Sequence, residues 1–121
     1  MAIAKPANWL SEPETVTVEV GNADSARINM AGRQPVGIYI PTGAEGATLT
    51  FDIAHAIGGT LYDLFDSAGA EYSVSIAAGQ YRQLDPQLFR GAVEMLMTVN
   101  TAQVGADADF IMMFAEPNKN F

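Results

Sequence analysis

The chain contains no cysteine, few basic residues and no long hydrophobic run. Without cysteine, disulfide bonds, thiolate chemistry and Cys-rich zinc sites are excluded, so stability must come from packing. No apolar stretch approaches the ~18 residues that a membrane span requires, and the first residues lack the basic and apolar regions of a secretion signal. We therefore expect a soluble, unsecreted protein with no membrane partner and no cofactor.

Basic residues are scarce relative to acidic ones. The 121 residues include 14 acids and 6 bases, which gives a formal net charge of −8. This charge opposes contact with phosphate backbones, so we expect no nucleic-acid partner. Residues 34–81 contain no lysine or arginine at all. If the fold gathers the arginines outside that segment, they would suit a carboxylate on a partner, and otherwise they are solvated in loops: Arg27, Arg33, Arg82 and Arg90.

Patterns for catalysis and metal binding are also missing. His55 is the single histidine, and without a neighbouring nucleophile it lacks the partners of a general base, so we interpret it as a loop residue. Asp63, Asp66 and Glu71 surround one turn, but their spacing matches no calcium loop. No nucleophile elbow, zinc-protease motif or phosphate-binding loop occurs. The sequence predicts a non-enzymatic protein with no catalytic and no metal-binding residues.

Alternation of apolar and polar residues dominates the chain. It predicts half-buried strands at residues 15–20, 36–40 and 49–53. Residues 60–65 and 71–76 predict a hairpin, because the turn between them contains an Asp that can bond its own backbone and a Gly that can adopt positive φ. The predicted core residues of these segments are Leu49, Phe51, Leu64, Tyr72, Val74 and Ile76.

The second half of the chain adds a helical turn and two strands of another kind. Asp85 as an N-cap followed by Pro86 predicts one helical turn that ends before Gly91. Residues 93–99 and 110–115 are apolar on both faces, which is typical of strands covered on both sides. Either loops shield their outer faces or those faces meet a neighbouring subunit, and the pattern leaves both open.

The spacing of strands and turns defines the fold class. The chain offers eight or nine strands, at the spacing of sandwiches and barrels. We predict an all-β protein, an antiparallel β-sandwich that is jelly-roll-like, at residues 14–121, with an extended N-terminal arm at residues 1–13. Prolines in the arm oppose regular pairing, yet Trp9 and Leu10 are costly to leave in water. We therefore expect the arm to dock on another surface.

Several short motifs occur together between residues 35 and 117. They are the strand end "VGIYIP", the strand "LTF", the hairpin "YDLFDSAGAE", a tyrosine before the turn "LDPQLFRG", and the final strand "FIMMFAEP". This combination resembles a group of small structural proteins of tailed bacteriophages. Where that group often has a polar turn after the "LTF" strand, this chain has "AHAIGG". No residue role is therefore carried over to that loop.

The resemblance implies a virion protein similar to jelly-roll capsid decoration, or cement, proteins. Such a protein would bind the outer capsid surface after assembly in the host cytoplasm, and would stabilise the shell by bridging adjacent capsomers of the major capsid protein. The resemblance implies no catalytic residue. The alternative is a tail, collar or head-fibre component, or a carbohydrate-binding module for host attachment, with a sugar platform built from Trp9 and the strand tyrosines: Tyr39, Tyr62, Tyr72 and Tyr81.

The predicted interface residues come from the arm, the first arginine segment and the two doubly apolar strands. We also expect a homo-oligomer, a dimer or a trimer, because a lattice joint on a symmetry axis requires a matching symmetric protein. The residues predicted at the capsid or oligomer interface are Trp9, Leu10, Arg27, Arg33, Met95 and Met112.

Overall fold

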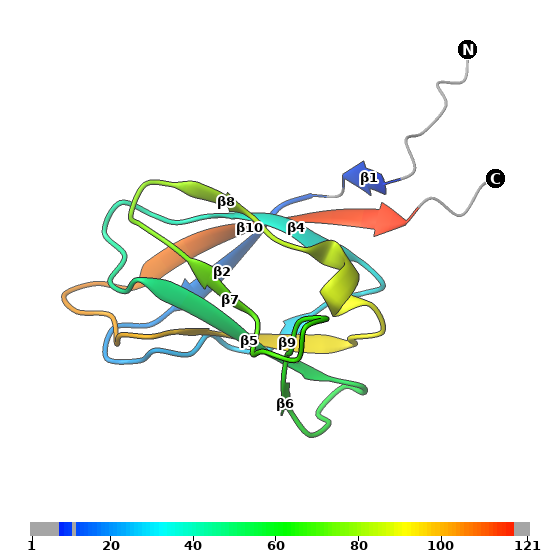
Figure 1. Ribbon diagram of the computed structural model, residues 1–121. Helices are drawn as coiled ribbons and strands as arrows, with labels where there is room; N and C mark the ends of the chain where they lie inside the picture. Colours follow the sequence, from blue (N-terminus) through cyan, green and yellow to red (C-terminus); the bar gives the residue numbers. More distant parts are fainter. Residues whose placement is uncertain (1–7, 11, 118–121) are drawn as a thin grey trace, which may run out of the picture.

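The computed structural model describes residues 8–10 and 12–117. These residues are nearly all β, with 46% strand and 4% helix, and they form two antiparallel sheets packed against each other (Figure 1). The predicted all-β sandwich is confirmed. Among the described residues, no helix has the length and the apolar character that crossing a membrane requires.

The first sheet, called here the β10 sheet, is built around the longest strand. Its order is β1/β2, β10, β4, β8, and all neighbouring pairs are antiparallel. β1 and β2 pair with successive parts of β10 on the side opposite β4, so together they form one interrupted edge strand. The bounds are β1 Asn8–Leu10, β2 Glu14–Val18, β4 Gln34–Tyr39, β8 Tyr81–Gln83 and β10 Ala108–Pro117.

The second sheet, called the β5 sheet, has the same plan. Its order is β3, β9, β5, β6/β7, again antiparallel throughout. β6 and β7 pair with successive parts of β5 on the side opposite β9, so this sheet also has an interrupted edge strand. The bounds are β3 Ile28–Asn29, β5 Thr48–Ala54, β6 Tyr62–Asp63, β7 Ser73–Ser75 and β9 Glu94–Val99.

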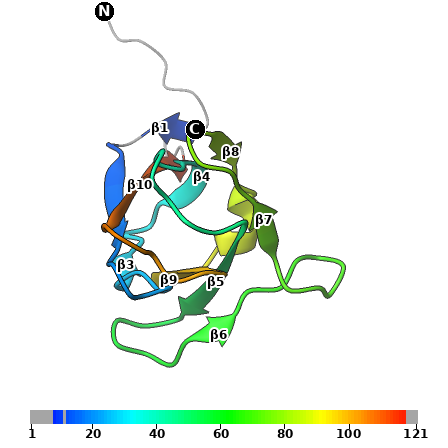
Figure 2. The ribbon, with the colours of Figure 1, turned by 90° about the vertical axis from the view of Figure 1, so that its left-hand side faces the viewer.

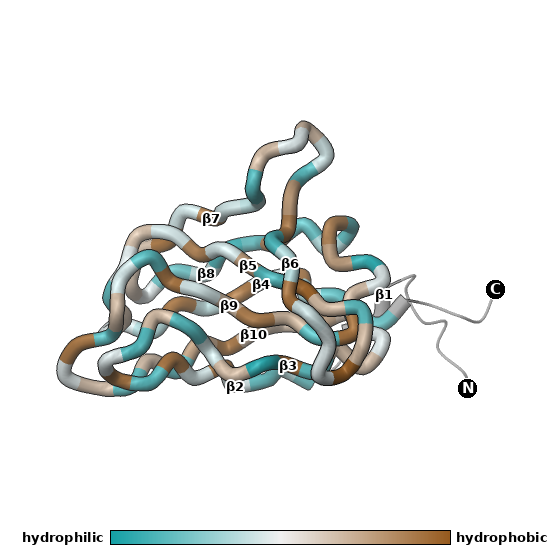
Figure 3. The backbone as a smooth tube through the Cα atoms, turned by 90° about the horizontal axis from the view of Figure 1, so that it is seen from below, coloured by the Kyte–Doolittle hydropathy of each residue, from teal (hydrophilic) through white to brown (hydrophobic). Residues whose placement is uncertain are grey.

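The predicted hairpin at residues 60–76 forms only in its central part. β6 and β7 do not pair with each other; both lie along β5. The chain folds back on itself at a bridge between Phe65 and Glu71, which is flanked by two hydrogen bonds, from the Tyr72 N–H to the Leu64 carbonyl and from the Asp66 N–H to the Ala70 carbonyl. Residues 65–71 therefore protrude from the sheet edge, while Leu64 and Tyr72 stay packed on the core. Figures 2 and 3 show this segment as the loop that stands clear of the sandwich.

The turn within this protrusion has the predicted chemistry. The Asp66 carboxylate accepts hydrogen bonds from the N–H groups of Ala68, at 2.9 Å, and of Ala70, at 3.0 Å. The Gly69 N–H donates to the Asp66 carbonyl at 3.0 Å, and Gly69 has a φ of 88°, in the region that glycine tolerates best. An Asp side chain that bonds the backbone two residues on is a local device, and the sequence alone indicates it.

The helical turn η1, Pro86–Phe89, also matches its prediction. The Asp85 side chain accepts from the Gln87 N–H at 3.1 Å, as an N-cap does, and Phe89 is buried. η1 closes one side of the core, where the Phe51 and Phe89 rings meet edge to face at 5.3 Å and the Phe51 and Tyr72 rings stack at 5.9 Å. The Tyr72 hydroxyl accepts a hydrogen bond from the Asp85 N–H at 3.0 Å.

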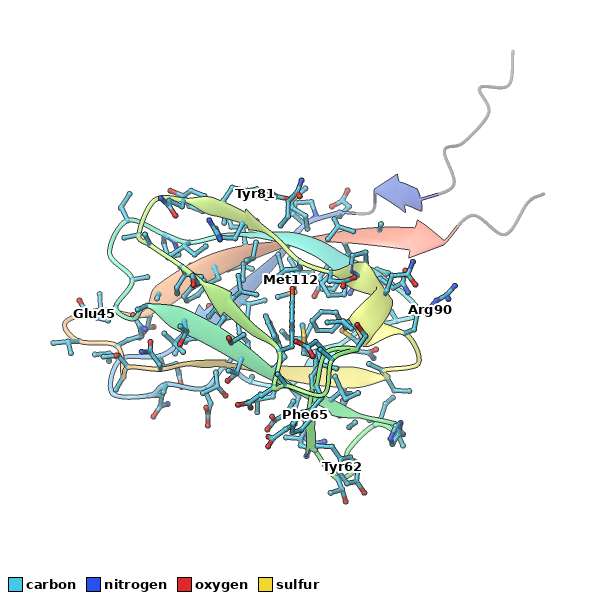
Figure 4. All side chains as sticks on the ribbon, viewed as in Figure 1. Glu45, Tyr62, Phe65, Tyr81, Arg90 and Met112 are labelled. Carbon is cyan, nitrogen blue, oxygen red and sulfur yellow. The ribbon has the colours of Figure 1, made fainter. Side chains whose placement is uncertain are left out.

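The core lies between the two sheets. Inward side chains of all the long strands contribute to it, and Figure 4 shows Met112 of β10 pointing into the space between the layers. Five of the predicted core residues are buried, namely Leu49, Phe51, Leu64, Val74 and Ile76, and Tyr72 is half-buried against them. The largest fully buried side chains of the core include Phe51, Phe89, Phe110, Phe114, Met30, Ile38, Ile40, Leu49, Met95, Met97 and Met112.

The chain alternates between the sheets. Every connection crosses from one sheet to the other except β1–β2, β5–β6 and β6–β7. The connections at residues 19–26, 40–47, 76–80 and 100–107 gather at one end of the sandwich, called here the loop end, while η1 and the β3–β4 turn lie at the opposite end (Figure 1). The loop end therefore combines segments that are far apart in the sequence.

Candidate functional site

The N-terminal arm lies partly within the described residues. Trp9 and Leu10 belong to β1, where their backbones pair with Glu116 and Ala115 of β10. Residues 1–7 and 11 of the predicted arm lie outside the described residues. The described part of the arm thus docks on the chain's own β10 sheet.

Arg33 serves the fold. Its guanidinium donates to the Glu14 carboxylate at 2.8 Å and to the carbonyls of Met30 and Asn29, at 3.0 and 3.1 Å. It also lies 4.1 Å from the centre of the Phe114 ring, a cation–π contact. Only 13% of the side chain is exposed. Arg33 therefore covers one end of the core and has little free surface for a partner.

Arg27 is likewise engaged within the chain. It donates to the Gly59 carbonyl at 2.6 Å and to the Glu94 carboxylate at 3.2 Å. The same carboxylate accepts from the Gly58 N–H at 2.9 Å. The bond from Gly58 lowers the pKa of Glu94 more than burial raises it, and Arg27 lowers that pKa further. These contacts fix the β5–β6 loop to β9.

The arginines are not all brought to one groove. A groove of about 470 Å³ beside η1 is lined by Arg33 and Arg90 but not by Arg27 or Arg82. Figure 4 shows Arg90 at the η1 end, opposite Glu45 at the loop end. The same groove includes Ala31, whose φ of 52° is left-handed although it is not a glycine. Of the four arginines, only Arg90 adds an exposed cation to this groove.

Met95 and Met112 are core residues. Both side chains are fully buried, with 0% exposure, so neither reaches a surface where a partner can bind. The outward positions on the same strands belong to Leu96, Met113 and Ile111, and Ile111 is 38% exposed. The chain's own loops therefore leave the outer face of β10 partly open.

The outer face of the β10 sheet carries a row of apolar and aromatic side chains. Tyr81, Tyr39 and Ile111 are cross-strand neighbours on β8, β4 and β10. The Tyr81 ring covers Gly37, where it leaves no room for a Cβ atom. Tyr81 itself is 51% exposed. Because Tyr62 belongs to the other sheet and Tyr72 packs in the core, the four tyrosines do not form one platform.

The outer face of the β5 sheet is polar and acidic. Asp52 of β5 lies directly opposite Asp63 of β6. Burial raises the pKa of Asp52, and the hydrogen bond and charge of Asp63 raise it further, followed by the charges of Glu71 and Asp24. Within residues 8–10 and 12–117, no group of three or more His, Cys, Asp or Glu side chains is placed to hold a metal ion.

Gln103 organises the loop end, and sequence reasoning missed it. The side chain is 1% exposed; its Oε1 accepts from the Glu45 N–H at 2.9 Å, and its Nε2 donates to the Glu45 carbonyl at 3.1 Å. Its backbone bonds Asn22 and Gly21 of the β2–β3 connection. Three loops are thus tied together through the side chain and the backbone of one residue. No local pattern marks a glutamine in an Ala- and Gly-rich loop as buried.

Comparison with known proteins adds no relative, since no protein-family model, no curated protein and no solved structure matches the chain. The surface carries the remaining functional signal. In the described part of the chain, the exposed large hydrophobic side chains lie on the loop end, on the β10 sheet face and around β6: Val20, Val104, Tyr81, Ile111, Ile57, Tyr62 and Phe65.

Proposed function

We propose that this chain is a capsid decoration protein of a tailed bacteriophage. It binds the outer surface of the assembled capsid and stabilises the shell by bridging adjacent capsomers of the major capsid protein. The observation that carries the proposal is the surface just described: the sandwich displays large hydrophobic side chains on protruding segments and open faces. Exposed apolar residues gathered in this way are typical of surfaces that bind other macromolecules.

Charge supports a location outside the shell. The loop end carries Glu19, Asp24, Glu45 and Asp107 and no lysine or arginine, and the whole chain has a net charge of −8. Packaged DNA repels such a body, whereas a capsid exterior does not need to bind phosphate. Assembly takes place in the reducing host cytoplasm, where a fold without disulfides loses nothing.

The strand order supports the jelly-roll part of the proposal. The sheets have the orders β2, β10, β4, β8 and β3, β9, β5, β6/β7, and the chain crosses between them at nearly every connection. A jelly roll is a double-sheet sandwich of eight strands with Greek-key connections. If each interrupted edge strand is counted once, the ten strands of the described residues become eight, as in that plan. We expect a symmetric dimer or trimer on the lattice.

Electron cryomicroscopy of heads from the phage that encodes the chain tests the proposal. We expect density for the sandwich outside the shell at the joints between capsomers, and no such density in heads from a phage that lacks the gene. Heads without the protein should also rupture at a lower temperature. Density confined to the tail or to fibres, or heads of unchanged appearance and heat resistance after gene deletion, would refute the proposal.

A host-attachment module is the second candidate function. One observation favours it: Tyr39 and Tyr81 are neighbours on the open face of the β10 sheet, where flat rings can stack on sugars. A glycan array probes this function directly. Binding that is lost in Tyr81→Ala and kept in Tyr62→Ala would establish the platform, and an array without signal would eliminate it.

A further inference from the structure

The exposed hydrophobic residues are concentrated around β6. Residues 55–71, called here the β6 ridge, include the β5–β6 loop, β6 and most of the protruding hairpin. Ile57 is 71% exposed, Tyr62 55% and Phe65 53%. Figure 4 shows Tyr62 and Phe65 beneath the β5 sheet, on the side away from the β10 sheet. Large apolar side chains that are exposed to solvent together on one element are typical of a binding surface.

The β6 ridge is built as an ordered element. Its hairpin is closed by the Asp66 turn and by the bond between Leu64 and Tyr72. Its loop is held by Glu94, which accepts from Gly58, and by Arg27, which donates to Gly59. An ordered element loses less conformational entropy on binding than a flexible one. The exposed side chains are thus displayed on a prepared support.

All free charge on the β6 ridge has one sign. Asp63, Asp66 and Glu71 lie on it, Asp52 faces it from β5, and residues 34–81 contain no lysine or arginine. Arg27, which donates to Gly59 of the ridge, is paired with Glu94. A complementary surface is therefore apolar at its centre and basic at its rim. A second copy of this chain, with its net charge of −8, fits that description poorly.

We infer that the β6 ridge is the docking element through which this protein binds a partner protein, whose site is an apolar pocket rimmed by lysine or arginine. Tyr62 and Phe65 are the anchors that enter the pocket, and the ridge acids meet its rim. The inference rests on the proposed function in taking the capsid exterior as the partner. It differs from the sequence-based expectation, which placed the docking residues on the arm, the arginines and the two late strands.

Binding to capsids that lack the protein tests the inference. The probe is heads from a phage without the gene, mixed with purified chain and analysed by co-sedimentation. We expect the double variant Tyr62→Ser/Phe65→Ser to bind at least tenfold more weakly than wild type. The matched control is Tyr81→Ser, which removes an aromatic side chain of similar exposure, 51%, from the other sheet. We expect its affinity to stay within twofold of wild type.

Charge reversal gives a second variant that leaves the apolar residues in place. Glu71 is exposed, so Glu71→Lys should fold normally and bind several-fold more weakly, and its affinity should fall less steeply with salt between 50 and 500 mM NaCl. Circular dichroism and thermal melting establish that each variant is folded. If the double variant does not fold, the Glu71→Lys result decides.

The outcomes separate this inference from the proposed function. If wild type binds and both ridge variants bind equally well, the ridge is not the docking element and the decoration role stands. If Tyr81→Ser alone loses binding, the docking face is the β10 sheet. If wild type does not bind heads, both proposals fail. Sedimentation of the chain alone tests the remaining occupant: self-association that only the ridge variants abolish, with capsid binding unchanged, would assign the ridge to a second copy.

Discussion

Both sheets of the sandwich have an edge strand made of two pieces, yet the two interruptions differ. β1 ends at Leu10, β2 begins at Glu14, and both pieces stay along β10. Between β6 and β7 the interruption spans residues 64–72, of which 65–71 leave the sheet and return to it. After a short break, the edge strand continues along the same neighbouring strand. A long break lets the intervening residues project from the sandwich, while the strand pieces on either side stay paired.

The two edges also differ in what holds them. β7 and the root of the hairpin are tied to the core by the contacts among Phe51, Tyr72 and Phe89. β6 is a two-residue strand whose pairing with β5 sets Asp63 against Asp52. The projection is therefore firmly rooted on its β7 side and electrostatically strained on its β6 side. Three pairs of variants separate these contributions.

The largest effect is expected from Phe51→Ala. Phe51 is fully buried and contacts both other rings of the group, so its removal opens a cavity beneath β5. We expect the free energy of unfolding to fall by about 3–5 kcal/mol, measured by urea denaturation. Phe65→Ala is the matched control, because Phe65 is 53% exposed on the same edge and its removal should cost less than about 0.5 kcal/mol. Similar losses of stability in the two variants would contradict the claim that the contacts of Phe51 hold the β7 side of the projection to the core.

An intermediate effect separates the two edges directly. Deleting residues 1–10 removes β1 and its pairing with β10, which we expect to cost about 1–2 kcal/mol of stability while the domain still melts cooperatively. Replacing residues 67–69 by Asn-Gly shortens the projection and keeps both the Asp66–Ala70 hydrogen bond and the Phe65–Glu71 bridge. A shorter loop is cheap to close, so stability should stay within about 0.5 kcal/mol of wild type.

Urea denaturation of both variants ranks the edges. If the pairing of β1 with β10 stabilises the β10 sheet, the variant without residues 1–10 should be less stable than the hairpin variant. A hairpin replacement that costs more than the arm deletion would show instead that the projection contributes to the fold and is not only displayed by it.

The local parts of this structure were predictable from sequence, and their assembly was not. Period-two patterns, the Asp66 turn and the Asp85 N-cap depend on neighbouring residues, and the structure has them. The partner of a strand is not a local property. The prediction therefore placed β6 and β7 against each other, whereas both pair with β5. When a strand is apolar on both faces, its sequence does not show which alternate residues point into the core. The pattern therefore could not distinguish buried Met112 from exposed Ile111.

Whether the predicted interface residues are free to meet a partner could not be predicted from the sequence, for a related reason. Arg27 and Arg33 read as free cations because their acidic partners, Glu94 and Glu14, are 67 and 19 residues away. The apolar pattern at residues 60–65 predicts a strand, and it does not show that Tyr62 and Phe65 are exposed. Burial and exposure arise from packing between distant segments, and only the folded chain distinguishes an anchor from a core residue.

The smallest effect concerns the strained side of the projection. Because the pKa of Asp52 is higher in the folded than in the unfolded chain, its stabilising contribution is complete below the unfolded pKa and is lost as the pH rises through the folded one. Asp52→Asn removes a like-charge pair, so the variant should exceed wild type in stability by about 0.5 kcal/mol at pH 7.

The pH dependence of this gain distinguishes local from general charge effects. The difference between Asp52→Asn and wild type should disappear below about pH 3.5, where carboxyl groups are protonated. Glu45→Gln removes the same charge from the loop end, far from β6, and should change stability little at any pH. If Asp52→Asn is less stable than wild type at pH 7, the Asp52 carboxylate stabilises the pairing of β5 with β6. The projection would then be held to the sheet on its β6 side as well as on its β7 side.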